Sequence, residues 1–399
     1  MVLSKINRCD IYVCIWALYT MQGILYPQGF INQLLQFIML FWALYVSCRY
    51  LLPNNLMPRL MRAASLLVYM YVIYGLIYLF SGHPAYSGDS ASPATYVYLQ
   101  NSLKSLLPIF LFYHYSINGY LTEKRLRVYL LLLTVVSIMS FQHNKSVILL
   151  SSSSRTEITN NMAYSFLGLI PMAYLYYKKP IWQFVFLSVL LFFILIGMKR
   201  GAILIGAICF LYFIYEMWKS AKNFKQRFLI LLLSIAIISF IVWRIMVLLE
   251  TSDYFVYRIA ETLAGDSSGR DTLATAIWTE FWKRSSVLNI LFGHGANSTI
   301  AFAGNYAHMD WLETLCNNGF IGVFILLYFY YSMLKETLKV NRKTCPHLRT
   351  VFLMLFLIAF LKTLFSMSIQ SMGLSTTIMI GYLMYVSKYQ IDETTSYNR

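Results

Sequence analysis

The chain has 399 residues, of which 59% are hydrophobic and only 12% charged, and its formal net charge at pH 7 is +16. The charged fraction is about half that of soluble domains, which excludes an ordinary soluble globular protein. Most Lys and Arg residues lie in short loops between apolar runs, so membrane topology and contact with anionic lipids explain the positive charge, and nucleic-acid binding is not needed.

Long apolar runs recur along the chain, and a bilayer-spanning helix needs about 20 such residues. They predict an all-α polytopic integral membrane protein with about twelve transmembrane helices. The first run lacks a convincing small-residue cleavage site, so we interpret it as a retained anchor. The predicted spans are 9–26, 31–52, 63–81, 103–119, 126–142, 162–177, 181–197, 201–218, 228–249, 312–334, 350–367 and 370–387.

The basic residues also predict the orientation of these spans. With the N-terminus placed in the cytoplasm, the short inner loops after a turn at Pro27 hold most of the Lys and Arg. We therefore predict that both termini are cytoplasmic. The predicted organisation is transmembrane helices in 1–249, a large outer loop in 250–311, further transmembrane helices in 312–387 and a cytoplasmic tail in 388–399.

The apolar run 181–218 is too long for one span, so it is expected to turn near Gly197 and Gly201. Basic clusters on either side place this turn on the outer face. There Lys199 and Arg200 run against the preference of basic residues for the inner face. Either the exception is tolerated, or Arg200 is held outside because an anionic ligand binds there.

The outer loop 250–311 is far longer than the usual connection of about 4–6 residues, which indicates a functional loop. Apolar residues recur with helical spacing from Thr272 to Trp282 and predict an amphipathic helix, which either lies on the membrane interface or packs on the outer ends of the spans. Ser267 or Ser268 can cap this helix. Arg270 would then lie at its N-terminus, where a guanidinium becomes favourable if an anion shares the site.

The loop ends in a helix that begins after His308. Asp310 and Glu313 share a face of its first turn, where they either stabilise the helix dipole or take part in proton transfer. The dipole does not explain His308. A metal site formed by His294, His308 and Asp310 is a weaker alternative, because these residues lack a typical metal-ligand spacing.

Together these motifs resemble the bacterial O-antigen polymerase and O-antigen ligase superfamily over about residues 190–330. Their order along the chain carries the resemblance. Met309, where ligases often have Asn after the His, and Lys199, where a small polar residue is common, favour a polymerase. The motifs are Lys199-Arg200-Gly201, Ser268-Gly269-Arg270, Gly293 with Gly295, and a helix led by His308 that ends in Gly319-x-x-Gly322.

The resemblance implies a metal-independent glycosyltransferase of GT-C-like fold, without a cofactor, in the bacterial inner membrane. It would polymerise O-antigen or capsular repeat units at the periplasmic face. Polyprenyl-pyrophosphate-linked glycans would be donor and acceptor, and a chain-length regulator protein would be a further partner. The expected pyrophosphate-binding residues are Arg200, Arg270 and Arg258, and the expected catalytic residues are His308, with Asp310 and Glu313 as alternatives.

The chemistry of the reaction supports this assignment independently. Breaking a sugar–pyrophosphate bond builds negative charge on the leaving group, which preorganised cations stabilise, and Arg makes better bidentate phosphate contacts than Lys. Two alternatives remain. One is an O-antigen ligase that transfers the polymer to the lipid A core. The other is a lipid-linked oligosaccharide flippase or transporter, although the polar candidates crowd one outer face and the two halves of the chain do not match.

Overall fold

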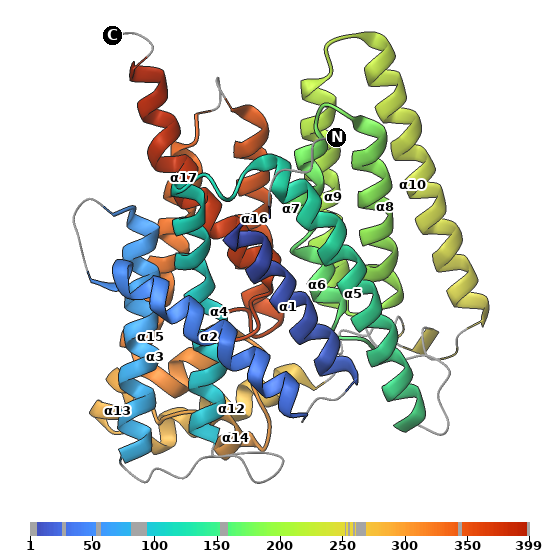
Figure 1. The fold of residues 1–399 in the computed structure, drawn as a ribbon. Coiled ribbons are helices and arrows are strands. Elements are labelled where there is room, and N and C mark those ends of the chain that lie inside the picture. The colour runs from blue at the N-terminus through green and yellow to red at the C-terminus, as the bar shows by residue number, and fades with distance from the viewer. Residues whose placement is uncertain are drawn as a thin grey trace. The chain divides into compact units, whose positions relative to one another are not determined.

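The computed structural model describes residues 6–25, 29–52, 57–80, 94–151, 159–251, 253, 256–257, 260, 269–341 and 345–396, and the regular structure in these residues is entirely helical. The helices are α1 Arg8–Leu25, α2 Phe30–Leu51, α3 Arg59–Phe80, α4 Ala94–Ile117, α5 Glu123–Ser151, α6 Ala163–Leu167, α7 Ile170–Ala173, η1 Tyr174–Tyr176, α8 Pro180–Ile196, α9 Arg200–Ser220, α10 Phe224–Thr251, α12 Arg270–Arg284, α13 Val287–Phe292, α14 Ser298–Ala303, α15 Asp310–Lys339, α16 Pro346–Phe365 and α17 Leu374–Ser396 (Figure 1).

Seven helices in the described part of the chain are long and apolar enough to cross a membrane. The protein is therefore an all-α membrane protein, as the composition predicts. The set is smaller than that of the predicted spans, and the helices in it are Phe30–Leu51, Arg59–Ile77, Glu123–Leu150, Arg200–Ser220, Phe224–Thr251, Asp310–Lys339 and Pro346–Phe365.

The predicted span 162–177 is not one continuous helix. It consists of α6, α7 and η1. Gly168 caps the end of the first, and Pro171, which has no backbone N–H to donate, lies in the first turn of the second. Phe166 and Leu167 are fully buried against neighbouring helices. Tertiary packing therefore decides the course of this apolar segment.

The chain divides into two compact units. The first contains Met1–Met39, Tyr120–Asp266 and Arg342–Ile358, and the second contains Leu40–Gly119, Ser267–Asn341 and Ala359–Arg399. Since these boundaries fall within α2 and α16, both helices contribute to both units.

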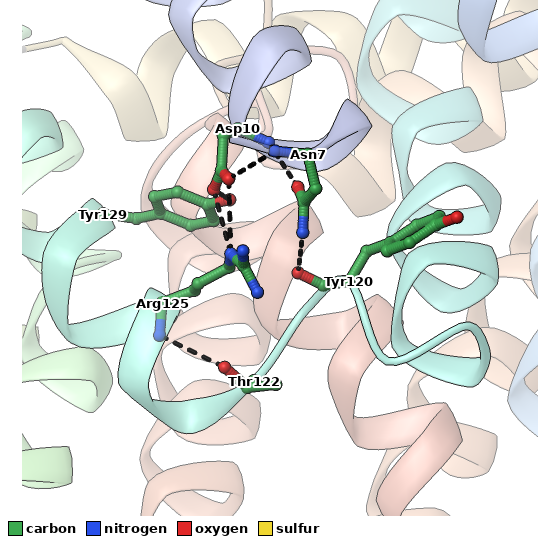
Figure 2. Close-up of polar contacts among 6 residues, drawn as sticks. All are labelled: Asn7, Asp10, Tyr120, Thr122, Arg125 and Tyr129. Carbon is green, nitrogen blue, oxygen red and sulfur yellow. Dashed lines mark hydrogen bonds and ion pairs between the residues drawn. The ribbon is translucent and has the colours of Figure 1, made fainter. Parts of the chain in front are cut away.

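A polar cluster in the first unit joins the start of α1 to the start of α5 (Figure 2). Arg125 Nε lies 3.2 Å from Asp10 Oδ1, and the Tyr129 hydroxyl donates a hydrogen bond of 2.5 Å to the same oxygen. Asn7 and Asp10 cap the first turn of α1, since each side chain accepts a hydrogen bond from the backbone N–H of the other residue. These contacts fix α1 against α5. They therefore give Asn7, Asp10 and Arg125 a structural role.

In the second unit, α3 packs against α4 and α15, and α17 packs against α4 and α15. Figure 1 shows α12, α13 and α14 gathered at one end of α3 and α4. A buried apolar cluster joins α12 to the first turns of α15, and it contains Ile277, Phe281, Ala307, Leu312, Leu315 and Cys316.

Candidate functional site

The site is built on a backbone crossing at a break in α15. Gly319 lies outside the helical region (φ 65°, ψ −167°) and breaks the helix one-third of the way along. A Cβ at Gly319 would lie 2.3 Å from the Leu291 carbonyl oxygen, and one at Gly293 would lie 2.4 Å from the Asn317 backbone, so both positions require glycine. The backbone N–H of His294 donates to the carbonyl of Cys316 at 2.7 Å, which satisfies one acceptor at the break.

Glu313 fixes the segment that carries His308. Its side chain lies in the first turn of α15 and is only 4% exposed. The carboxylate accepts hydrogen bonds from the backbone N–H of Ala307 at 2.6 Å and from the Thr299 hydroxyl at 2.9 Å, and it also contacts the backbone of His308. Because several contacts converge on one buried side chain, Glu313 holds the 307–308 backbone in place.

Asp310, one helical turn before Glu313, holds a different segment of the chain. It is 5% exposed, and its Oδ2 atom accepts hydrogen bonds from the backbone N–H groups of Ser368 at 2.8 Å and Ile369 at 3.2 Å. Both donors lie in the connection between α16 and α17. Asp310 therefore ties the start of α15 to this connection.

Arg270 contacts the end of α16 at Phe365. This residue lies three positions before Ser368, which donates to Asp310. Arg270 is the first residue of α12, and its Nη1 atom donates to the Phe365 carbonyl oxygen at 3.3 Å. This contact uses one of the five N–H donors of a guanidinium. The capping residue is Gly269 (φ 72°), which supplies no side-chain hydrogen bond. Ser267 and Ser268, the predicted caps, lie outside the described residues.

His308 has an exposed side chain and a left-handed backbone (φ 54°). Such a conformation in a non-glycine residue costs about 1–3 kcal/mol, and it persists only where the surroundings enforce it. Its ring centroid lies 6.5 Å from that of Tyr306, and partial burial raises the pKa of the Tyr306 hydroxyl. Exposure and an enforced backbone distinguish His308 from the buried carboxylates beside it.

Arg270, His308, Asp310 and Glu313 thus all lie in the second unit. Glu313 holds the backbone of His308, and Arg270 and Asp310 both bond to backbone groups at or just after the end of α16. Arg200, the first residue of α9, belongs to the first unit. Its role as a second ligand of the same phosphate stays a prediction. Arg258 lies outside the described residues.

The basic turn before Arg200 is confirmed as a turn. α8 ends at Ile196, Gly197 caps it, and α9 begins at Arg200. The Gly197 carbonyl accepts a hydrogen bond of 2.8 Å from the backbone N–H of Asn160, which anchors the turn within the first unit. Met198 has a left-handed backbone (φ 50°) at the centre of this turn.

His294 is accounted for by packing. Its Nε2 atom lies 2.7 Å from the Ser285 hydroxyl, and its ring makes edge contacts with Phe281 and Phe302 at centroid distances of 5.7 and 5.0 Å. No group of three or more His, Cys, Asp or Glu side chains in the described part of the chain could hold a metal ion. His294, His308 and Asp310 are therefore not gathered as a set of metal ligands among the described residues.

The predicted amphipathic helix is confirmed as α12, which begins slightly earlier than expected. Its residues Ile277 and Phe281 are fully buried, so the packing alternative holds for this face. Trp278 and Trp282, one residue further round the helix, are exposed. Lys362 is a charged residue within a predicted span, and the sequence indicates no partner for it. Its Nζ atom donates to the carbonyl oxygen of Ser371 at 3.2 Å.

No protein-family model matches the chain, and no curated protein matches it. The resemblance to the O-antigen polymerase and ligase superfamily is therefore carried by the motifs alone.

Proposed function

We propose that this protein is a glycosyltransferase that polymerises polyprenyl-pyrophosphate-linked oligosaccharide repeat units at the periplasmic face of a bacterial inner membrane. The proposal includes about twelve spans, cytoplasmic termini and a GT-C-like fold. The observation that carries it is the arrangement at the start of α15. There an exposed His308 with an enforced backbone shares one unit with Arg270, and two buried carboxylates hold the segments around them.

In the proposed reaction, a hydroxyl group of the acceptor glycan attacks the anomeric carbon of the donor sugar. The new glycosidic C–O bond forms while the bond from that carbon to the pyrophosphate oxygen breaks. The hydroxyl proton passes to the neutral imidazole of His308, and polyprenyl pyrophosphate leaves with the bonding electrons. Arg270, with Arg200 as the predicted second cation, stabilises the charge that builds on the leaving group.

Asp310 and Glu313 have a different part in this proposal. Each carboxylate already accepts hydrogen bonds from at least two groups of the protein, and both are almost fully buried. They position the backbone around the reacting groups, and His308 takes the proton. His308 is preferred as the base because its side chain is exposed, whereas the two carboxylates are buried and already hydrogen-bonded.

Deletion of the gene tests the proposed activity. A polymerase mutant should retain single repeat units attached to the lipid A core, because ligation does not require polymerisation. Loss of all repeats from the core, with long lipid-linked chains remaining, would instead indicate a ligase. Repeat units that remain on the cytoplasmic side of the membrane would indicate a flippase, and either result would refute the polymerase.

A further inference from the structure

The helix α13 exposes several large apolar side chains. It has six residues, Val287–Phe292, and none of them is buried. Val287 is 74% exposed and Leu288 is 68% exposed, and Leu291 and Phe292 are exposed as well. Soluble surfaces rarely gather this many large apolar side chains in so short a segment, so such a patch marks an interaction site.

The conformation of α13 is well fixed despite this exposure. Ser286 and Asn289 form a reciprocal capping box at its start, in which each side chain bonds to the backbone of the other residue. At its end, the crossing of Gly293 with Gly319 locks it against α15. The exposed apolar face is therefore held in place and does not fold away into the unit.

Neighbouring residues of α12 add aromatic and basic groups. The exposed rings of Trp278 and Trp282 lie 5.6 Å apart in an edge contact. Lys283 and Arg284 follow directly, with largely exposed side chains, and both pair with Glu280, which leaves a net positive charge. Exposed Trp beside Lys and Arg is the pattern of the bilayer interface, where rings lie at headgroup level and cations reach lipid phosphates.

The apolar face also adjoins a helix that can cross the membrane. Beyond the break at Gly319, α15 exposes Ile321, Phe324 and Leu327, which recur every three residues along one side. Such a side faces lipid in a membrane-spanning helix. The helix α13 packs against α15 and crosses it at the break, directly before this exposed side begins.

We propose that α12 and α13 form a membrane-interface anchor. The anchor consists of Trp278, Trp282, Val287, Leu288, Leu291 and Phe292. Its apolar side chains insert among the lipid acyl and glycerol groups, and Lys283 and Arg284 bind anionic phosphates at the headgroup level. Since Arg270 begins the same helix, the anchor also sets the depth of that guanidinium relative to the headgroups. The proposal needs a membrane protein only and does not depend on the enzymatic activity.

Site-specific fluorescence in nanodiscs tests the anchor directly. The accessible cysteines Cys14, Cys48 and Cys345 are first replaced by Ser, and a nitrobenzoxadiazole probe is then attached to Leu288→Cys. The control is Asn305→Cys, an exposed polar position in the same unit. The nanodiscs contain phosphatidylcholine and phosphatidylglycerol, with a nitroxide-labelled lipid as the quencher.

The anchor predicts that the nitroxide lipid quenches the probe at Leu288→Cys at least about twofold more than at the control, and that aqueous iodide quenches it less. Equal quenching by the lipid at both positions would overturn the proposal, and low quenching by both lipid and iodide would show that protein covers α13. Charge reversal at Lys283 and Arg284 (K283E with R284E) should lower lipid quenching in anionic nanodiscs and leave it unchanged in phosphatidylcholine alone. An identical decrease in both lipids would refute the electrostatic part.

Discussion

Replacing Glu313 by Gln should release the backbone around His308. The amide keeps one acceptor oxygen, and its NH₂ group can only donate. The Thr299 hydroxyl can turn round and accept from this group, but the backbone N–H groups of Ala307 and His308 must then share the single remaining oxygen. A hydrogen bond within a protein contributes about 0.5–1.5 kcal/mol net, and leaving its buried partner unsatisfied costs about 1–3 kcal/mol. The left-handed conformation of His308 costs about 1–3 kcal/mol, which is the same size. The contacts therefore only just outweigh the strain, and Glu313→Gln should let the segment relax.

Two measurements follow this change. Hydrogen exchange should show that the backbone amides of Ala307 and His308 lose protection, and chain extension should fall about tenfold to a hundredfold, because each 1.4 kcal/mol corresponds to one factor of ten. Glu280→Gln is the matched control, since Glu280 forms exposed ion pairs on α12 that contribute about 0–1 kcal/mol. Unchanged amide protection and polymer length in Glu313→Gln would refute the reasoning.

The remaining predictions concern the contacts that hold the two units in shape. Asp310→Ala should shorten the polymer while the protein still inserts, because it leaves the buried backbone N–H groups of Ser368 and Ile369 without an acceptor, at a cost of about 1–3 kcal/mol; a normal polymer ladder on gels would argue against its positioning role. Gly319→Ala should prevent stable folding in detergent, whereas Gly304→Ala, also at positive φ but with open space around its Cβ, should lower the melting temperature only slightly; equal effects of the two would contradict the backbone crossing. Asp10→Asn should destabilise the first unit by about 1–3 kcal/mol in thermal unfolding, since it weakens the contact with Arg125, and no change would show that the pair is dispensable.

The local features of the chain could be predicted because they depend on neighbouring residues. Helical spacing gave α12, the pair Gly197 and Gly201 gave the turn before α9, and two acidic residues marked the first turn of α15. These signals arise from periodicity and from turn chemistry, which act over a few residues.

The contacts that assemble the site could not be predicted in this way. Asp310 bonds to Ser368 and Ile369, which lie almost sixty residues further along the chain, and no local pattern indicates that pairing. Gly319 was recognised only as part of the Gly319-x-x-Gly322 motif, and its crossing with the backbone before Gly293 is visible only in the structure. Hydropathy predicted that residues 162–177 form one span. The structure divides this segment into short helices near Pro171, because packing rather than hydropathy decides the course of the segment.

The proposed polymerase is tested most directly by chain extension in variants of Arg270 and His308. Each variant is expressed in the deletion strain, and its lipid-linked and core-linked glycans are separated on gels, with membrane insertion checked by immunoblot. Arg270→Ala and His308→Ala should insert normally and leave only single repeat units, and Arg270→Lys should retain part of the activity. Lys335→Ala, a control at an exposed basic residue of the same unit, should give the full ladder. Full-length polymer in both Arg270→Ala and His308→Ala would contradict the account.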